Sequence, residues 1–242
     1  MLRIIEYFYM PVTISARKIF WILTGISLCL LSIHLAFVYL NTTFELTSYT
    51  KMAIDRFNMD AEVSIPTWFE QTLFLAGSLF SAMLALAQKA KEDKKAWLGI
   101  SGIMLYLSID ESSAIHELIA EPVRNTLNII SGPFIFAWTI PVLILIIILT
   151  LLYFQFFLRL EKRTRLLLIL SGLVFVGGAA GFEIISGAYW SYKNFAFDAF
   201  YSILTGLEEI FELLGLSMFI YAVLDALSNT QQSSIPTIQF KK

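Results

Sequence analysis

The stretch LSIDESSAIHEL, residues 107–118, places three carboxylates and one imidazole within eight residues. These groups are Asp110, Glu111, His116 and Glu117, and they follow an apolar run, AWLGISGIMLY, that has the composition of a membrane helix. Carboxylates near an imidazole can bind Fe, Mn or Zn, and they can also move protons as general acids and bases. The stretch therefore predicts a site with chemistry.

Further acidic residues interrupt apolar segments elsewhere in the chain, namely Glu70, Glu183, Glu208, Glu209 and Glu212. When each segment is threaded as a helix with a rise of about 1.5 Å per residue, these groups and Asp110 all fall in one half of the membrane. Glu209 and Glu212 would lie one turn apart on one helix face. Residues far apart in the sequence are therefore expected to meet at one depth.

The angular positions within residues 97–120 add to this expectation, provided that the segment is one continuous helix. At 100° per residue, Asp110, Ser113 and Glu117 would share a face, His116 would flank it, and Glu111 would point about 100° away. Helical bundles hold two-metal sites with Glu and Glu-x-x-His motifs that project inward. No strict Glu-x-x-His is present here, so the pattern predicts a polar site more strongly than a two-metal site.

The energetic cost of these acids indicates what they bind. A charged side chain at mid-bilayer costs roughly 2.5 to 3.5 kcal/mol, so seven would cost about 20 kcal/mol, more than the net stability of a typical domain. The expected spans contain no Lys or Arg to neutralise them. This leaves bound protons, cations or a water-filled cavity. The candidate metals are Fe, Zn and Mn, and these residues are the expected ligands: Asp110, His116, Glu117, Glu183, Glu209 and Glu212.

The other titratable residues have simpler interpretations. Glu111 and Glu208 are the candidate catalytic residues, as acid/base groups or as second-layer groups around the metal ligands. Glu70 is expected behind the ligands or at the rim. His34, alone on an apolar segment, is more often a packed or hydrogen-bonded side chain than a ligand. Asp198 is expected to be the N-cap of the last helix.

The composition predicts an all-α membrane protein. Of 242 residues, 57% are hydrophobic and 15% are charged, which is more apolar than a soluble domain. Six segments are long enough to span a bilayer. They lie near residues 19–40, 67–88, 97–120, 134–157, 166–189 and 200–226. The first is too long for a cleavable signal and is expected to remain as a membrane helix.

The distribution of basic residues predicts the topology. With both termini in the cytoplasm, 13 of the 17 Lys and Arg residues face inward, as the positive-inside rule requires. We expect one six-helix domain over residues 1–227 and a polar, disordered cytoplasmic tail over 228–242. The expected location is a bacterial inner membrane.

Three functions from different classes fit these features. The first is a membrane-embedded metalloenzyme, a hydrolase or an oxidoreductase, that acts on a lipid or another hydrophobic molecule. The second is a proton- or cation-coupled transporter or channel. The third is a non-catalytic subunit of a membrane complex. Membrane lipids are the expected partners, and the small-residue face of Gly177 and Gly181 could form a homo-oligomer or a larger assembly; nucleic acid is not an expected partner.

Overall fold

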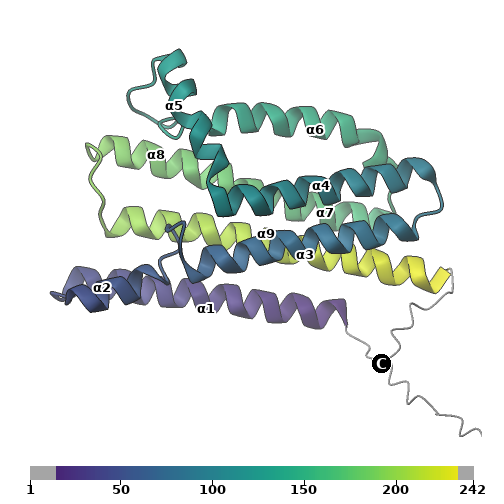
Figure 1. Cartoon of the computed structure of the whole chain (residues 1–242), viewed down its shortest axis with the longest axis horizontal. Helices are drawn as coiled ribbons and strands as arrows, with labels where there is room; N and C mark the ends of the chain where they lie inside the picture. The colour runs from purple at the N-terminus through teal and green to yellow at the C-terminus, as the bar shows by residue number, and fades with distance from the viewer. Residues whose placement is uncertain (1–14, 234–242) are drawn as a thin grey trace, which may run out of the picture.

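The computed structural model describes residues 15–233, with side chains up to residue 230, and within that range it is helical without strands. Its long helices run along a common axis, and the short helix Ile115–Leu127 is inclined to them (Figure 1). They are α1 (Ala16–Thr43), α2 (Ser48–Asp55), α3 (Ile65–Ala87), α4 (Lys91–Ser113), α5 (Ile115–Leu127), α6 (Thr139–Arg159), α7 (Lys162–Val176), the π-helix η1 (Gly177–Phe182), α8 (Glu183–Tyr192) and α9 (Ala199–Ser233).

Side-chain caps set the starts of the helices near the predicted site. The Ser64 hydroxyl accepts a hydrogen bond from the Thr67 amide at the start of α3, where Pro66 occupies the first turn. The Asp198 carboxylate accepts one from the Tyr201 amide at the start of α9, which confirms its prediction as an N-cap. Such caps satisfy amide groups that a helix leaves without partners.

Helix α9 packs along both α1 and α3. Along α1 it is antiparallel, because His34 meets Ser202 at one end and Phe20 meets Tyr221 near the other. Helix α4 is antiparallel to α3, with Ser78 bonded to Ser101 and the Ser108 hydroxyl donating to the Gln71 carbonyl. The described ends at residues 15 and 233 therefore lie at one end of the bundle, and α2 and α5 lie at the other (Figure 1). We call these the terminal end and the α5 end.

Five helices of the described residues are long and apolar enough to cross a membrane: α1, α3, α6, the α7–η1–α8 unit and α9. The predicted third span does not meet this criterion. Charged residues occupy both ends of α4, from Lys91 to Lys95 and at Asp110 and Glu111, so only the 14 residues 96–109 are free of charge. That stretch is about 21 Å long, against about 30 Å for the hydrocarbon layer.

The third segment also differs from its prediction in shape. Helix α4 ends at Ser113, and Ala114 adopts a left-handed conformation with φ 46° and ψ 43° before α5 begins. The continuous helix expected over residues 97–120 is therefore wrong. A residue with a Cβ atom in this region costs about 1 to 2 kcal/mol. This strained residue lies at the turn between α4 and α5.

The last helix extends past the expected domain boundary. Helix α9 continues to Ser233, beyond the expected domain end at residue 227. Residues 234–242, on which the rest of the disordered-tail prediction falls, lie outside the described residues.

Candidate functional site

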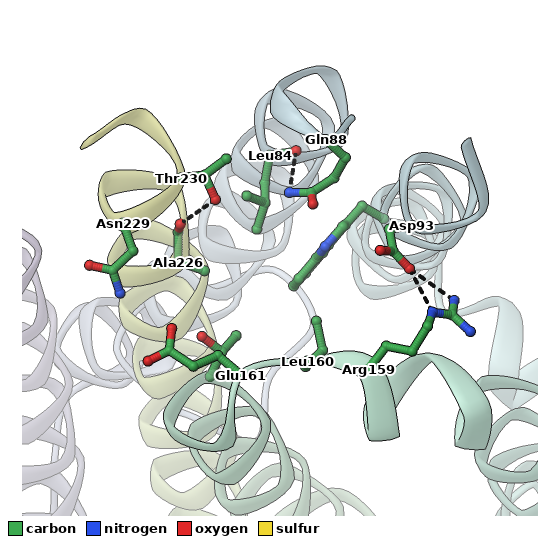
Figure 2. Close-up of a pocket in the computed structure, with 11 residues that line it drawn as sticks. Leu84, Gln88, Asp93, Arg159, Leu160, Glu161, Ala226, Asn229 and Thr230 are labelled. Carbon is green, nitrogen blue, oxygen red and sulfur yellow. Dashed lines mark hydrogen bonds and ion pairs between the residues drawn. The ribbon is translucent and has the colours of Figure 1, made fainter. Parts of the chain in front are cut away.

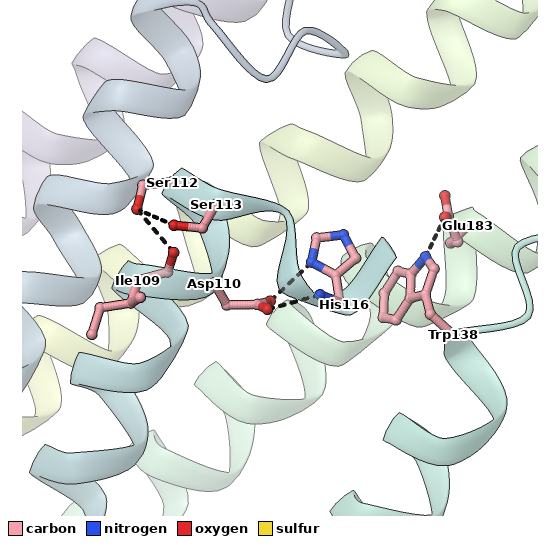
Figure 3. A network of polar contacts seen from close by, with 7 residues as sticks. All are labelled: Ile109, Asp110, Ser112, Ser113, His116, Trp138 and Glu183. Carbon is pink, nitrogen blue, oxygen red and sulfur yellow. Dashed lines mark hydrogen bonds and ion pairs between the residues drawn. The ribbon is translucent and has the colours of Figure 1, made fainter. Parts of the chain in front are cut away.

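The break at Ala114 places His116 directly against Asp110. The Asp110 carboxylate accepts the His116 backbone N–H at 2.9 Å through Oδ1 and the ring Nδ1–H at 2.9 Å through Oδ2 (Figure 3). Because an ionised carboxylate only accepts, Nδ1 carries the proton in the neutral ring, and Nε2 is left with a lone pair. The pair therefore has the arrangement of an oriented base, in which a carboxylate fixes the tautomer of an imidazole.

The indole of Trp138 connects this pair to the next acid. Its ring meets the His116 ring edge-on, with centroids 4.8 Å apart, and its Nε1–H donates to Glu183 Oε1 at 3.0 Å (Figure 3). The Glu183 carboxyl group in turn lies within hydrogen-bonding reach of the Glu208 carboxyl group. Helices α4, α5, α8 and α9 thus each contribute to one polar network, with Trp138 placed just before α6.

A second group of acids lies deeper in the bundle, between α3 and α9. The Glu70 carboxyl group is within hydrogen-bonding reach of those of Glu209 and Glu212, and the charge of Glu111 on α4 acts on it as well. We call these four residues the inner acid group. Glu70 is only 1% exposed, and its Oε1 has no hydrogen-bond donor among the described residues.

Close contact between α9 and η1 positions the glutamates of α9. A Cβ atom on Gly178 would lie 2.8 Å from the Glu208 carbonyl oxygen and 2.9 Å from Glu212 Cγ. Only glycine permits this approach. The small residue that lets the helices meet is therefore Gly178; a Cβ atom on Gly177 or Gly181 would meet nothing within 4 Å.

Two further acids, which the sequence analysis missed, come from the segment between α2 and α3. Burial, together with the charges of Glu183, Glu117 and Glu62, raises the pKa of Asp60 to about 7, although part of the residue is solvent-accessible. Burial and the charge of Glu117 also raise the pKa of Glu62. Both residues precede α3 in a segment without hydrophobic periodicity, so only the tertiary structure shows that they belong to the site.

No basic side chain neutralises these acids. Within residues 15–230, the Lys and Arg ion pairs are Arg159–Asp93, Arg163–Asp225 and Lys193–Asp198. None of them involves the inner acid group or the network around His116. Apart from the donors of His116 and Trp138, the side chains of the cluster are carboxyl groups, which only accept hydrogen bonds when ionised.

A profile described as "Domain of unknown function (DUF8692)" matches residues 22–227, which is most of the sequence. The chain belongs to the DUF8692 family. No match was found among curated proteins or among solved structures.

In this DUF8692 chain the predicted site residues divide between two places. Glu209, Glu212 and Glu111 are in the inner acid group, whereas Asp110, His116, Glu183 and Glu208 form the network around Trp138. Glu117 is exposed. The single face predicted for Asp110, Ser113 and Glu117 is wrong, because the left-handed Ala114 lies between them.

Glu70 and His34 complete the comparison with the sequence analysis. A rim position is wrong for Glu70, which is among the most buried side chains. His34 is buried and hydrogen-bonded on both ring nitrogens, which confirms the packing interpretation. As the side chains are placed, no three His, Cys, Asp or Glu of the described residues converge in a group that could hold a metal ion.

A pocket of about 270 Å³ lies at the opposite, terminal end of this DUF8692 chain (Figure 2). The Asp93–Arg159 ion pair borders it, and Trp97 and Glu161 line it. Its Asp93 is paired with an arginine, so its chemistry differs from that of the inner acid group, whose acids form no ion pair with Lys or Arg of the described residues.

Proposed function

We propose that the chain crosses the membrane six times, with α4 as the sixth crossing and both termini in the cytoplasm. The terminal end carries Arg17, Lys18, Arg159 and Arg163, which supports a cytoplasmic position for it. Both described ends lie at the terminal end, so in this proposal the chain crosses the membrane an even number of times. Hydropathy identifies five crossings, and α4 supplies the sixth. Its packing along α3 buries Met104, whereas Leu98, Leu105 and Ile109 stay exposed and would face lipid. A bacterial inner membrane remains the location that we propose.

We propose that the acid cluster binds a divalent cation and serves a membrane-embedded metalloenzyme that acts on a lipid or another hydrophobic substrate. The observation that carries this proposal is the buried Glu70 carboxyl group, which contacts two other carboxyl groups and has an oxygen without a donor. Three carboxylates in apolar surroundings repel one another and lose hydration, so they need protons or a cation between them. Carboxylate oxygens also suit Mn, Fe and Zn when an imidazole is near.

In this proposal the inner acid group holds the cation. Its carboxyl groups lie against one another in the structure, so their side chains would rotate modestly to make room for the cation. A bound divalent cation would supply Lewis-acid activation of water or a substrate oxygen. His116, oriented by Asp110, would move a proton at its free Nε2, and Trp138 would hold the Glu183 carboxylate in place. Glu208, next to Glu183, would accept or return that proton.

The surroundings of His116 support a hydrophobic substrate. Leu118 is 71% exposed and Ile119 is 41% exposed, directly after His116 and Glu117, and Ile109 precedes Asp110 with 49% exposure. In a membrane these side chains would contact lipid beside the Asp110–His116 pair. A lipid-borne group could therefore reach His116 from the side of the bundle, whereas the inner acid group is enclosed by helices.

The metal content of the detergent-purified chain tests this proposal. We expect a stoichiometric divalent metal in the wild type, its loss in Glu70→Gln, and its retention in Glu45→Gln, which removes an acid outside the cluster. Incubation with a membrane lipid extract, followed by mass spectrometry, should show a lipid converted by the wild type and not by His116→Ala. Purified protein without metal, whose melting is unchanged by a chelator, would refute the metal site.

The paired carboxyl groups favour a proton- or cation-coupled transporter as the second candidate. The carboxyl groups of Glu70 and Glu212, and those of Glu183 and Glu208, lie within hydrogen-bonding reach of each other, so a transporter could pass a proton between them. Against this candidate, an apolar core that includes Phe74, Leu216 and Ile220 lies on the terminal side of the inner acid group. Cation flux into proteoliposomes that Glu209→Gln abolishes would place transport ahead of the enzyme.

A further inference from the structure

The segment that carries Asp60 is fastened to the bundle on both sides of that residue. On one side Met59 is 1% exposed within the apolar core, and its N–H donates to His34 Nδ1 at 3.2 Å. On the other side the Ala61 carbonyl accepts a hydrogen bond from the Thr67 hydroxyl at 2.7 Å. Asp60 is thus held between two fixed neighbours.

His34 provides the attachment that reaches across the bundle. Its Nδ1 accepts the Met59 N–H, so its Nε2 carries the proton and donates to the Ser202 carbonyl on α9 at 2.8 Å. A Cβ atom on Gly206 would lie 2.8 Å from His34 Cδ2, so glycine makes room for the ring there. A single buried imidazole therefore connects α1, α9 and the segment before α3.

This attachment brings Asp60 to the solvent side of the acid cluster. Its carboxylate interacts with those of Glu117 on α5 and Glu183 on α8, and its charge also acts on Glu209 of the inner acid group. Asp60 keeps solvent exposure, whereas Glu70 at the inner end of the cluster has almost none. Asp60 therefore both reaches solvent and acts on Glu209 in the inner acid group, as exposed Glu62 does on Glu111.

We propose that Asp60 is a cation-binding residue through which the acid cluster receives its cation from the outer solvent, and that His34 is the positioning residue that holds Asp60 there. This inference rests on the proposed cation site. The buried Glu70 oxygen without a donor is the independent sign that the cluster takes a positive ligand. Because opposite charge near a narrow access path raises local ion concentration, removal of Asp60 should slow association and weaken affinity.

The first experiment measures Mn²⁺ affinity and association rate for the full chain in nanodiscs. We expect Asp60→Asn to weaken binding roughly tenfold, within the range for groups around a metal site. Asp55→Asn is the matched control, because Asp55 is an exposed acid at the end of α2, on the same side of the protein. Its effect should stay below about twofold, because exposed charges beyond about 8 Å are screened at physiological salt.

The second experiment uses two substitutions that each keep one half of the His34 connection. Asparagine reaches about as far as Nδ1, so His34→Asn retains an acceptor for the Met59 N–H and loses the bond to Ser202. Glutamine reaches about as far as Nε2, so His34→Gln retains the donor to Ser202 and loses the bond to Met59. Each variant loses one hydrogen bond, so both should lose similar stability.

The positioning role predicts that these two variants differ in other measurements. His34→Asn should retain Mn²⁺ affinity and slow hydrogen–deuterium exchange in residues 56–64. His34→Gln should expose that segment to exchange and weaken Mn²⁺ binding as much as Asp60→Asn does. Equal Mn²⁺ affinity in the two His34 variants would overturn the positioning role, because a purely structural histidine would affect both alike.

The outcomes separate this inference from the function on which it rests. A wild-type chain that binds no Mn²⁺ overturns the proposed cation site, and the role of Asp60 with it. A wild type that binds Mn²⁺, together with Asp60→Asn and Asp55→Asn variants of equal affinity, leaves the cation site standing and overturns only the role of Asp60.

Discussion

Gly178→Ala should disturb the acid cluster without altering any of its acids. The new methyl group would lie 2.8 Å from the Glu208 carbonyl oxygen, 2.9 Å from Glu212 Cγ and 3.0 Å from the Glu212 nitrogen. Two of these atoms belong to backbone, so the contact can be relieved only if η1 and α9 separate. Such overpacking costs about 1 to 3 kcal/mol. The gain from replacing glycine by alanine in a helix offsets about 0.5 to 1 kcal/mol of that cost.

The net loss is therefore about 0 to 2.5 kcal/mol, which corresponds to a fall in Tm of up to roughly 10 °C for a chain of this size. Thermal unfolding followed by tryptophan fluorescence in detergent would measure it. Because separation of η1 from α9 also moves Glu208 and Glu212, we expect weaker Mn²⁺ binding as well.

Gly177→Ala and Gly181→Ala are the matched controls, since their methyl groups would meet nothing within 4 Å. Both should raise Tm by about 1 to 4 °C through helix propensity alone. A Gly178→Ala protein as stable as these controls would refute the close approach of η1 to α9. A control variant that dissociates an oligomer in native mass spectrometry would instead support the predicted Gly177/Gly181 interface.

Three further perturbations follow from the site. The fold raises the pKa of Asp60 from 3.8 to about 7. Between these pH values the native state binds more protons than the unfolded state. The free energy of unfolding therefore falls as pH rises from about 4, and the loss is complete above about 7. For a partly exposed group the loss is at most about 1 to 2 kcal/mol, and Asp60→Asn should flatten the dependence of Tm on pH. Trp138→Phe should cost about 1 to 3 kcal/mol in chemical unfolding because Glu183 loses its donor, whereas Trp190→Phe should cost less, because the buried Trp190 Nε1 has no partner. Ala114→Gly should keep or raise the free energy of unfolding by relieving a left-handed conformation. Ala114→Val should lower that free energy by more than about 1 kcal/mol, and equal values for the two variants would contradict the strained turn.

Much of the helical architecture could be predicted from the sequence, because long apolar runs leave few alternatives to helices in a membrane protein. The depth argument also anticipated neighbours: the structure places Glu183 against Glu208, two residues that are 25 positions apart. Local composition did not predict the break at Ala114, since neither glycine nor proline stands there. The sequence on both sides of Ala114 is compatible with a helix, and the Asp110–His116 contact forms only once the helix is broken.

Two members of the site were misjudged for different physical reasons. Glu70 is a single acid on an otherwise apolar helix, so the pattern favoured a peripheral role, and only the packing of α3 against α9 brings it to Glu209 and Glu212. Asp60 lies in a segment that contacts His34, a residue 26 positions earlier. The contact is a hydrogen bond from the backbone N–H of Met59 to His34 Nδ1. Long-range contacts of this kind leave no periodic signal in the sequence.

Two aspartates at the terminal end and the inner acid group differ in their partners, and this contrast supports a ligand more directly than the number of acids does. At the terminal end, Asp93 and Asp225 each pair with an arginine at 2.9 Å. In the inner acid group, Glu70 is more deeply buried than either aspartate. The side chains within hydrogen-bonding reach of its carboxyl group are other carboxyl groups. If these glutamates served only to join helices, a donor such as the indole that meets Glu183 would satisfy Glu70 at lower cost. A buried oxygen without a donor lowers stability unless something positive occupies the space beside it. The inner acid group is therefore better explained by the binding of an exchangeable proton or cation than by the needs of folding.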